Sequence, residues 1–290
     1  MDPDSPDLLQ PQALSAYGGG WSAQLRARVE RIAGRSTLAG VAHHGPLRLQ
    51  KALWPEGPDP VHLIVLHPPG GIAAGDTLAL ELAVGASAHA LLTTPGAGHW
   101  YRADAPARQG VRLSVGPGAT LEWLPQEVIV HDGAQALSGV RMELAAGAAA
   151  IGLDVSVFGR RDCGERFASG QMQQSLEIEL EGRLLLEDHA QVTGGELEAI
   201  SVLGPHHVSG LLWAVPSQPL PSELAERVEA AMTSAGAALC GASALEPRLL
   251  LARAVDSSPE RVRAALTQAW RVLRPLLLGR EAVLPRIWMT

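Results

Sequence analysis

The feature that most constrains the fold is a strict alternation of apolar and polar residues in short runs that recur before residue 215. Between positions 21 and 30, Trp, Ala, Leu, Ala and Val occupy every second position, with Ser, Gln, Arg and Glu between them. A period of two places the apolar side chains on one face of an extended chain, as in a half-buried strand. Similar runs occur at 78–84, 111–115, 149–157 and 176–180, between clusters of Gly and Pro. The sequence therefore predicts an all-β body, either β-helix-like or built of layered antiparallel sheets.

A different periodicity appears only near the C-terminal end, where apolar residues recur every three or four positions. This spacing predicts one helix near residues 221–235 and a second near 258–278. Pro259 fits the first turn of the second helix, and Gly279 fits its C-terminal cap. The apolar stripe of this helix is expected to pack on the β body or under a helix of a partner, with Trp270 as its anchor.

Length and charge limit the class of protein. A chain of 290 residues can bury a substantial core, and we expect a mobile tail over residues 1–19 followed by a single β-rich domain over 20–290. The sequence has no run of about 18 apolar residues, so no membrane partner is expected. A net charge of −7 without a basic cluster argues against nucleic acid. The acidic N-terminal residues differ from the basic start of a secretory signal, which favours a cytoplasmic location.

Motifs of common enzyme classes are missing from the sequence. The single lysine, Lys51, does not follow the glycines of a phosphate-binding loop. Cys163 and Cys240 are too far apart for a C-x-x-C pair. Neither a G-x-S-x-G nor an H-E-x-x-H motif occurs. We therefore expect a protein that is not an enzyme and that holds no tightly bound cofactor.

Four carboxylates stand in or beside tight turn motifs and are candidate contacts for a passing metal ion, namely Asp76, Glu127, Asp154 and Glu165. Asp154 lies between apolar neighbours, and a buried charge must be paired, hydrated or bound to a metal. Carboxylate oxygens and water are suitable ligands for hard and borderline cations. His67 is a further candidate, because it enters a Pro-Pro-Gly-Gly turn where its ring could face an opening.

These residues also have a structural interpretation. Asp76 could cap the turn that it closes, and ion pairs could join Arg160 to Asp154 or Arg161 to Glu165. Such contacts would use the carboxylates inside the chain and leave them unavailable to a metal. The sequence alone leaves both interpretations open.

Five motifs occur in the order typical of a known family, the urease accessory proteins of the UreD (UreH) type. They are Pro-Pro-Gly-Gly with Gly-Asp at 66–76, Thr-Thr-Pro-Gly-Ala at 93–97 with Tyr-Arg at 101–102, Leu-Glu-Trp-Leu-Pro-Gln-Glu at 121–127, the segment 154–165, and the segment 270–288. The chain resembles this family over nearly its whole length beyond residue 19. Two positions depart from the family's pattern: His99 stands where a basic residue is common, and His131 where an aromatic residue is common. We assign no ligand role to either histidine.

The resemblance implies a β-rich scaffold that acts as a chaperone of urease maturation. Members of this family bind the urease apoprotein on one side and UreF on the other, and UreF recruits the GTPase UreG. They assist GTP-dependent nickel insertion, in which Ni²⁺ is bound only transiently along an internal, water-filled passage. Two alternatives are a metal-dependent hydrolase and a purely structural β scaffold without a metal passage.

The resemblance and the apolar stripe of the second helix together suggest where a partner could bind. Trp270, Leu273, Arg274 and Arg280 belong to the fifth motif and lie on or just after this helix. We predict these four residues as contacts of a partner protein.

Overall fold

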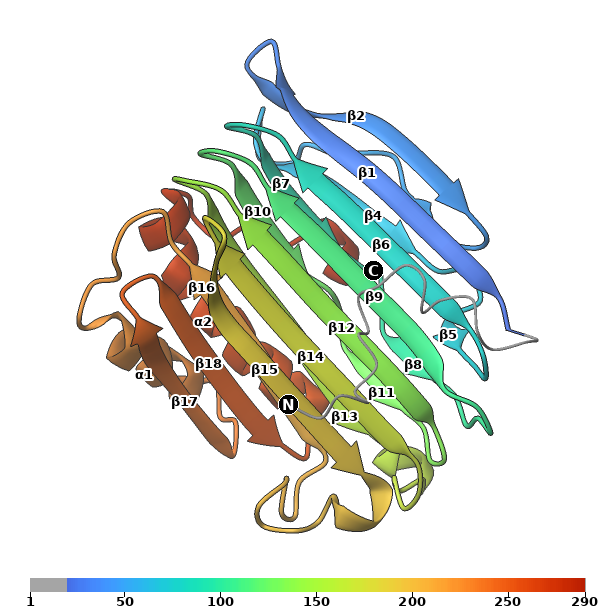
Figure 1. Ribbon diagram of the computed structural model, residues 1–290. Helices are drawn as coiled ribbons and strands as arrows, with labels where there is room; N and C mark the ends of the chain where they lie inside the picture. Colours follow the sequence, from blue (N-terminus) through green and yellow to red (C-terminus); the bar gives the residue numbers. More distant parts are fainter. Residues whose placement is uncertain (1–19, 290) are drawn as a thin grey trace.

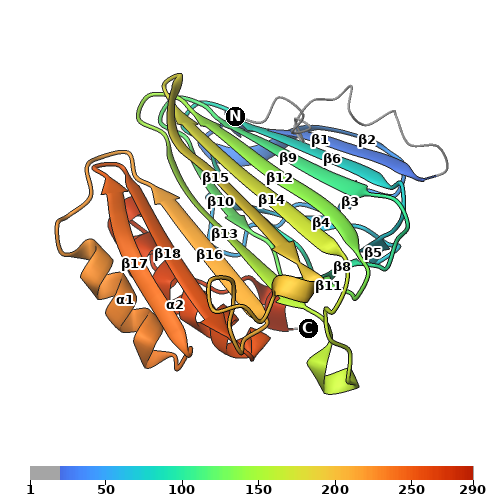
Figure 2. The ribbon, with the colours of Figure 1, turned by 60° about the horizontal axis from the view of Figure 1, so that its bottom comes forward.

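Two β-sheets packed face to face make up most of the structure, and two helices cover the outer face of one of them (Figure 1). The computed structural model describes residues 20–289. The mobile tail predicted over residues 1–19 lies outside these described residues. Figure 2, turned from the first view, shows both helices behind the strands at the C-terminal end of the chain.

The first sheet has its strands in the order β15-β14-β12-β9-β6-β1-β2. The strands are β1 (Ser22–Ile32), β2 (Arg35–His44), β6 (Thr77–Val84), β9 (Ala107–Val115), β12 (Gln135–Leu144), β14 (Gln171–Leu180) and β15 (Arg183–Thr193). The second sheet has the order β17-β18-β16-β13-β10-β7-β4-β3, and a short strip of β5, β8 and β11 extends from β13. These strands are β3 (Arg48–Leu49), β4 (Val61–Leu66), β5 (Gly71–Ile72), β7 (His89–Thr93), β8 (Gly98–Trp100), β10 (Thr120–Leu124), β11 (Val128–Val130), β13 (Ala149–Phe158), β16 (Val208–Val215), β17 (Leu239–Glu246) and β18 (Leu249–Asp256).

The central strands of both sheets are parallel. In the first sheet β1, β6, β9, β12 and β14 pair in parallel, and in the second so do β4, β7, β10 and β13. The chain crosses to the second sheet after β6, β9 and β12, so strands that share a sheet start from the same end. Antiparallel pairs occur toward the edges, at β1–β2, β3–β4, β14–β15 and from β13 through β16 and β18 to β17.

The prediction of antiparallel sheets is therefore wrong for the central strands. An alternating pattern indicates which face of a strand is buried, and it contains no information on the direction of the neighbouring strand. The strand-dominated fold is confirmed, and the β-helix-like form of it stays a prediction.

The apolar side chains form two layers. One layer lies between the sheets and contains the inward residues of the first sheet, such as Leu25, Leu82 and Leu113, each at most 2% exposed. The other lies between the second sheet and the helices. Strand β7 is buried at all five positions because it is covered on both faces, whereas β6 and β9 have a solvent face and keep the alternation.

The two helices are α1 (Leu224–Ser234) and α2 (Pro259–Leu278), which confirms both predicted segments. Ser258 Oγ caps α2 by accepting a hydrogen bond from Arg261 N, and Gly279 ends it in a left-handed conformation, φ +64°. The β17–β18 hairpin between the helices was not predicted. Short 3₁₀ helices span Arg161–Cys163, Gly194–Glu196 and Arg286–Met289. Within residues 20–289, no helix is both long and apolar enough to cross a membrane.

A buried charge network fastens α2 to the β body. Arg274 is fully buried and donates through Nε to Glu122 Oε2 (2.9 Å) and through its terminal nitrogens to both oxygens of Glu56 (2.8 and 2.9 Å). Trp270 Nε1 donates to the same Glu122 oxygen (2.8 Å). Because Glu122 belongs to β10 and Glu56 to the loop before β4, one guanidinium joins three distant segments.

These contacts decide between the two expectations for the apolar stripe of α2, which packs on the β body. Trp270, Leu273 and Arg274 are at most 1% exposed among residues of the same chain. The structure thus places them in internal contacts, in contrast to the prediction that they bind a partner. A partner contact at the half-buried Arg280 stays a prediction.

We predict that Trp270→Ala destabilises the protein by about 3–5 kcal/mol, because it leaves a cavity and removes a donor from the buried Glu122. The measurement is denaturant unfolding. Trp21→Ala is the matched control, since the Trp21 residue is 62% exposed and its loss should change the free energy of unfolding by less than about 0.5 kcal/mol. Equal stability of the Trp270→Ala variant and the wild type would contradict the packing of α2 described above.

We also predict a loss of stability in acid that depends on Glu122. Burial raises the pKa of Glu122, but hydrogen bonding and charge from His89 and Arg274 outweigh this and lower it to about 2, from 4.5. A folded-state pKa below the unfolded value stabilises the protein above about pH 4.5, and this contribution is lost as the pH falls toward 2. Unfolding at several pH values in this range should show a smaller acid loss for Glu122→Gln than for wild type. Glu187→Gln, at an exposed carboxylate, should keep the wild-type slope.

Candidate functional site

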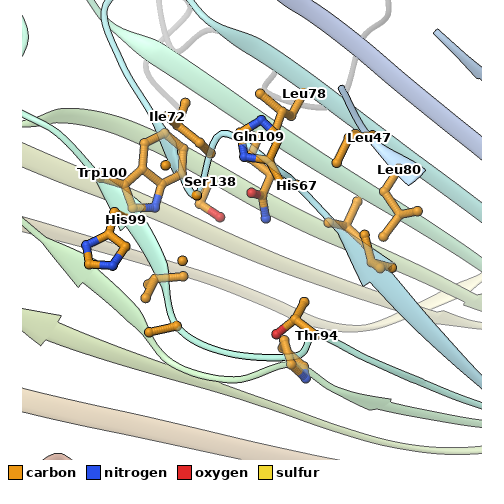
Figure 3. Close-up of a pocket in the computed structure, with 18 of the residues that line it drawn as sticks. Leu47, His67, Ile72, Leu78, Leu80, Thr94, His99, Trp100, Gln109 and Ser138 are labelled. Atoms are coloured by element: carbon orange, nitrogen blue, oxygen red, sulfur yellow. The ribbon is translucent and has the colours of Figure 1, made fainter. Parts of the chain in front are cut away.

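A cavity of about 270 Å³ lies between the two sheets. Its walls are mainly apolar, and Figure 3 shows Trp100 and His99 at one end and Leu47 and Leu80 at the other. The polar side chains among its lining residues are His67, Thr94, His99, Gln109, Ser138 and Asp154. Since a water molecule occupies about 30 Å³ in the liquid, the cavity has room for several.

A row of polar side chains crosses the inner face of the first sheet. Gln109 of β9 is in register with Ser138 of β12, which is in register with Gln174 of β14. Gln109 and Ser138 line the large cavity, and Gln174 lines a second cavity of about 80 Å³. The inner face of a β-sandwich is normally apolar, because an unpaired polar group there is costly. The polar row therefore connects the two cavities along the direction perpendicular to the strands.

Asp154 of β13 stands where the cavities meet and lines both of them. Its Oδ1 accepts long hydrogen bonds from Gln174 Nε2 (3.3 Å) and Ser156 Oγ (3.4 Å). Burial raises the pKa of the Asp154 carboxyl, and the two hydrogen bonds only partly offset this. Asp154 is thus a weakly paired carboxylate in the interior of the sandwich.

The smaller cavity contains an unsatisfied donor. Trp213 Nε1 is buried and finds no hydrogen-bond acceptor among the described residues. The Trp213 indole lies across Gly152, where any Cβ would come within 2.3 Å of the ring. An ion pair between Arg253 and Asp188 (2.8 Å) joins the sheets beside this cavity, and both residues line it. A buried N–H of this kind is normally satisfied by water, which fits a hydrated cavity.

The end of the Pro-Pro-Gly-Gly motif forms part of the wall of the large cavity, on the side where His99 and Trp100 lie. Gly71 of β5 is in register with His99 of β8, and a Cβ on Gly71 would lie 2.2 Å from Tyr101 Cε2. His67 lines the cavity, as the sequence suggested. Burial lowers the pKa of His67, although the charge of Asp76 opposes this.

Three of the predicted metal contacts have other surroundings. Asp76 accepts hydrogen bonds from the backbone N–H groups of Trp21 (2.8 Å) and Ala73 (2.9 Å), in line with the turn-capping alternative. Glu165 pairs with Arg160 (2.7 Å) rather than with Arg161.

Glu127 is the third such residue, and it lies outside both sets of cavity-lining residues. Burial lowers the pKa of Arg263 to about 10, and the negative charge of Glu127 opposes this shift. Of the four predicted carboxylates, the cavities therefore include Asp154 alone. Within residues 20–289, no group of three or more His, Cys, Asp and Glu side chains is placed to hold a metal ion.

Sequence reasoning missed the polar row and a histidine pair. Gln109, Ser138 and Gln174 break the apolar alternation of their strands, which is a signal visible in the sequence once the inward positions are known. His99 and His131 lie 32 positions apart, and a hydrogen bond of 2.9 Å joins His99 Nδ1 and His131 Nε2. No local pattern indicates this contact, because it depends on the pairing of β8 with β11.

We predict that Gly71→Ala lowers stability by about 1–3 kcal/mol, since the new methyl group would overlap Tyr101 and lie 2.9 Å from His99 Cβ. Thermal or denaturant unfolding provides the measurement. Gly96→Ala is the control: Gly96 also lines the cavity, but no atom beyond its two chain neighbours lies within 4 Å of the position that its new methyl group would take. Equal effects of the two substitutions would contradict the close contact at Gly71.

Comparison with known proteins extends over nearly all of the chain. A family model described as "UreD urease accessory protein" matches residues 22–289. The urease accessory protein UreD of Pseudomonas aeruginosa is 43% identical over 270 residues, which cover 93% of this chain and 95% of that protein. The UreD of Dechloromonas aromatica is 42% identical over 284 residues, 97% of this chain and 98% of its own. That of Delftia acidovorans is 40% identical over 297 residues, with 96% and 97% covered.

Proposed function

The chain belongs to the family of UreD urease accessory proteins, and from this premise we propose that it is a nickel-insertion chaperone of urease. The family is one of accessory proteins rather than enzymes. In this proposal the chain acts in the cytoplasm as a scaffold for the urease apoprotein and UreF, and through UreF for UreG. It assists GTP-dependent delivery of Ni²⁺, which it binds only in passing.

The observation that supports a passage is the position of Asp154 between two interior cavities. The polar row of Gln109, Ser138 and Gln174 runs along the same path, and Trp213 Nε1 offers a further hydrogen bond to water. A sandwich that served only as a scaffold would gain stability from apolar residues at these positions. The presence of polar groups at these positions therefore favours a role that requires water in the interior.

An ion in such a passage would keep much of its water shell. The walls of the large cavity are mainly apolar, so they offer few ligands to replace water. Asp154 adds a carboxylate at the junction, which favours a cation over an anion. Conduction requires binding that is weak enough for the ion to leave, and a site with few protein ligands meets this requirement better than a closed cluster.

A purely structural scaffold is the second candidate. The hydrogen bonds of Asp76 and the ion pair of Glu165 favour structural roles for those two carboxylates. The same interpretation fails to account for Asp154, because burial raises its pKa and so makes its charged form unfavourable in the folded state. A metal-dependent hydrolase is disfavoured by membership of an accessory-protein family.

We predict that Asp154→Asn reduces urease activation while the assembly with UreF, UreG and apo-urease stays intact. The variant should be as stable as the wild type or more stable at pH 7.5. The sign follows from the raised pKa of Asp154. When the folded-state pKa of a carboxyl exceeds its unfolded value, the protein loses stability as the pH rises through the folded-state pKa. Activation by nickel, assembly by pull-down, and unfolding would be measured on the same variant. Asp154→Ala should impair activation in the same direction.

The control is Asp104→Asn, because Asp104 is an exposed carboxylate outside both cavities. It should leave all three measurements unchanged. Normal activation by both Asp154 variants would refute the passage and leave the scaffold. Joint loss of stability, assembly and activation in Asp154→Asn would mark the carboxylate as structural.

A further inference from the structure

Two histidine rings meet at one end of the large cavity and hold each other in a fixed orientation. His99 Nδ1 lies 2.9 Å from His131 Nε2. Tyr101 stacks on His99 with 5.6 Å between ring centroids and 10° between planes, and its ring also lies 5.0 Å from that of His131. A backbone hydrogen bond also joins the two segments that carry the rings, since His131 N donates to Trp100 O (3.0 Å).

A carboxylate behind this pair determines where the protons lie. Glu165 Oε2 lies 3.5 Å from His131 Nδ1 and accepts a hydrogen bond from Arg160 Nε (2.7 Å). An ionised carboxylate can only accept hydrogen bonds, so the proton of a neutral His131 belongs on Nδ1. His131 Nε2 is then an acceptor, and His99 must donate from Nδ1. A neutral His99 consequently has its lone pair on Nε2.

The ionisation states agree with this assignment. Burial raises the pKa of Glu165, but the hydrogen bond from Arg160 and nearby charges outweigh it, so the net shift is downward. Burial lowers the pKa of His99, and the charge of Arg160 lowers it further. Burial also lowers the pKa of His131, against the opposing charge of Glu165. The hydrogen bond between His99 Nδ1 and His131 Nε2 itself requires that one of these two nitrogens is unprotonated, because one of them must accept.

We infer that His99 Nε2 is a single-imidazole contact for a borderline divalent cation at the end of the cavity, and that His131 and Glu165 are positioning residues that keep this nitrogen free of a proton. His99 lines the cavity, and of its two ring nitrogens only Nδ1 takes part in a hydrogen bond among residues 20–289. Imidazole is a suitable ligand for Ni²⁺, and outer groups that accept the other N–H commonly fix the tautomer of a ligating histidine. The choice of Ni²⁺ as cargo rests on the proposed function.

A contact of this kind would be weak and exchangeable. The described residues provide no cluster of three ligating groups, so water would complete the coordination of the ion. Glu165, predicted from sequence as a metal contact, acts here through His131, because Arg160 already pairs with its carboxylate.

The test uses the full chain labelled with ¹⁵N at pH 7.5, without any partner. Long-range ¹H–¹⁵N correlation spectra report which nitrogen of each imidazole is protonated, and titration with NiCl₂ reports which rings are broadened by the ion. We expect wild-type His99 to be protonated on Nδ1 and to be broadened by Ni²⁺. His131→Phe should shift the proton of His99 toward Nε2 and weaken the Ni²⁺ effect by about tenfold.

Two further variants keep the inference falsifiable if His131→Phe alters the fold. Glu165→Gln preserves the size of the side chain and should weaken the Ni²⁺ effect in the same direction. His189→Phe is the matched control, because His189 also contacts a carboxylate (Glu187, 3.2 Å) but lies exposed on β15. It should leave the His99 signals unchanged.

Protonation of wild-type His99 on Nε2 would overturn the inference, as would a Ni²⁺ effect on His99 that neither His131→Phe nor Glu165→Gln weakens. These outcomes are separate from urease activation. If His99 does not bind Ni²⁺ while Asp154→Asn still reduces activation, the passage stands without this contact. If His99 binds Ni²⁺ while the Asp154 variants activate urease normally, the contact stands and the passage fails.

Discussion

The position of the C-terminal helix depends on one fully buried guanidinium. Arg274 lies between Glu56 and Glu122, whose side chains are at most 5% exposed. Two imidazoles complete the network, since His89 Nε2 lies 2.9 Å from Glu122 and His62 Nε2 lies 2.8 Å from Glu56. A buried ion pair adds little net stability relative to apolar residues, but loss of one partner leaves a charge without compensation. The network therefore favours one placement of α2 over others, and the outer layer of the core forms around that placement.

The interior between the two sheets is packed more loosely than the layer under α2. Around Asp154 the packing leaves space, and the side chains of Asp154, Ser156 and Gln174 contact one another only at long distances of 3.2–3.4 Å. The two regions share the second sheet, because Glu122 and Asp154 belong to the paired strands β10 and β13. The tightly bonded side of this sheet supports the loosely packed side. A stable outer layer is thus compatible with a hydrated interior that contributes less to the stability of the fold.

The sequence predicted those features that depend on local periodicity. The strand at β1, the helix α2 and its Gly279 cap were all visible in the spacing of residues. Features that depend on long-range pairing were not visible, including the parallel direction of the central strands and the contact between His99 and His131. The motifs did identify residues that meet in space: Trp288 Nε1 donates to Thr93 Oγ1 (2.8 Å), and that hydroxyl donates to Leu124 O (2.5 Å). Of the predicted site, Asp154 of β13 and His67 line the cavity. Which side of their segments faces the cavity depends on how the two sheets pack, and the local sequence does not contain this information.

The crossing of the chain between sheets also affects how the protein reaches its native state. Leu80, Val111 and Val140 lie side by side on neighbouring strands, yet each is separated from the next by a full passage through the other sheet. No hairpin can form in this region from adjacent segments, so the two sheets must grow together from contacts that are distant in sequence. Such topologies fold slowly and expose apolar strand edges for longer than hairpin-rich ones. A newly made chain would therefore be prone to aggregation until the edge strands β2 and β15 of the first sheet and β3 and β17 of the second are in place.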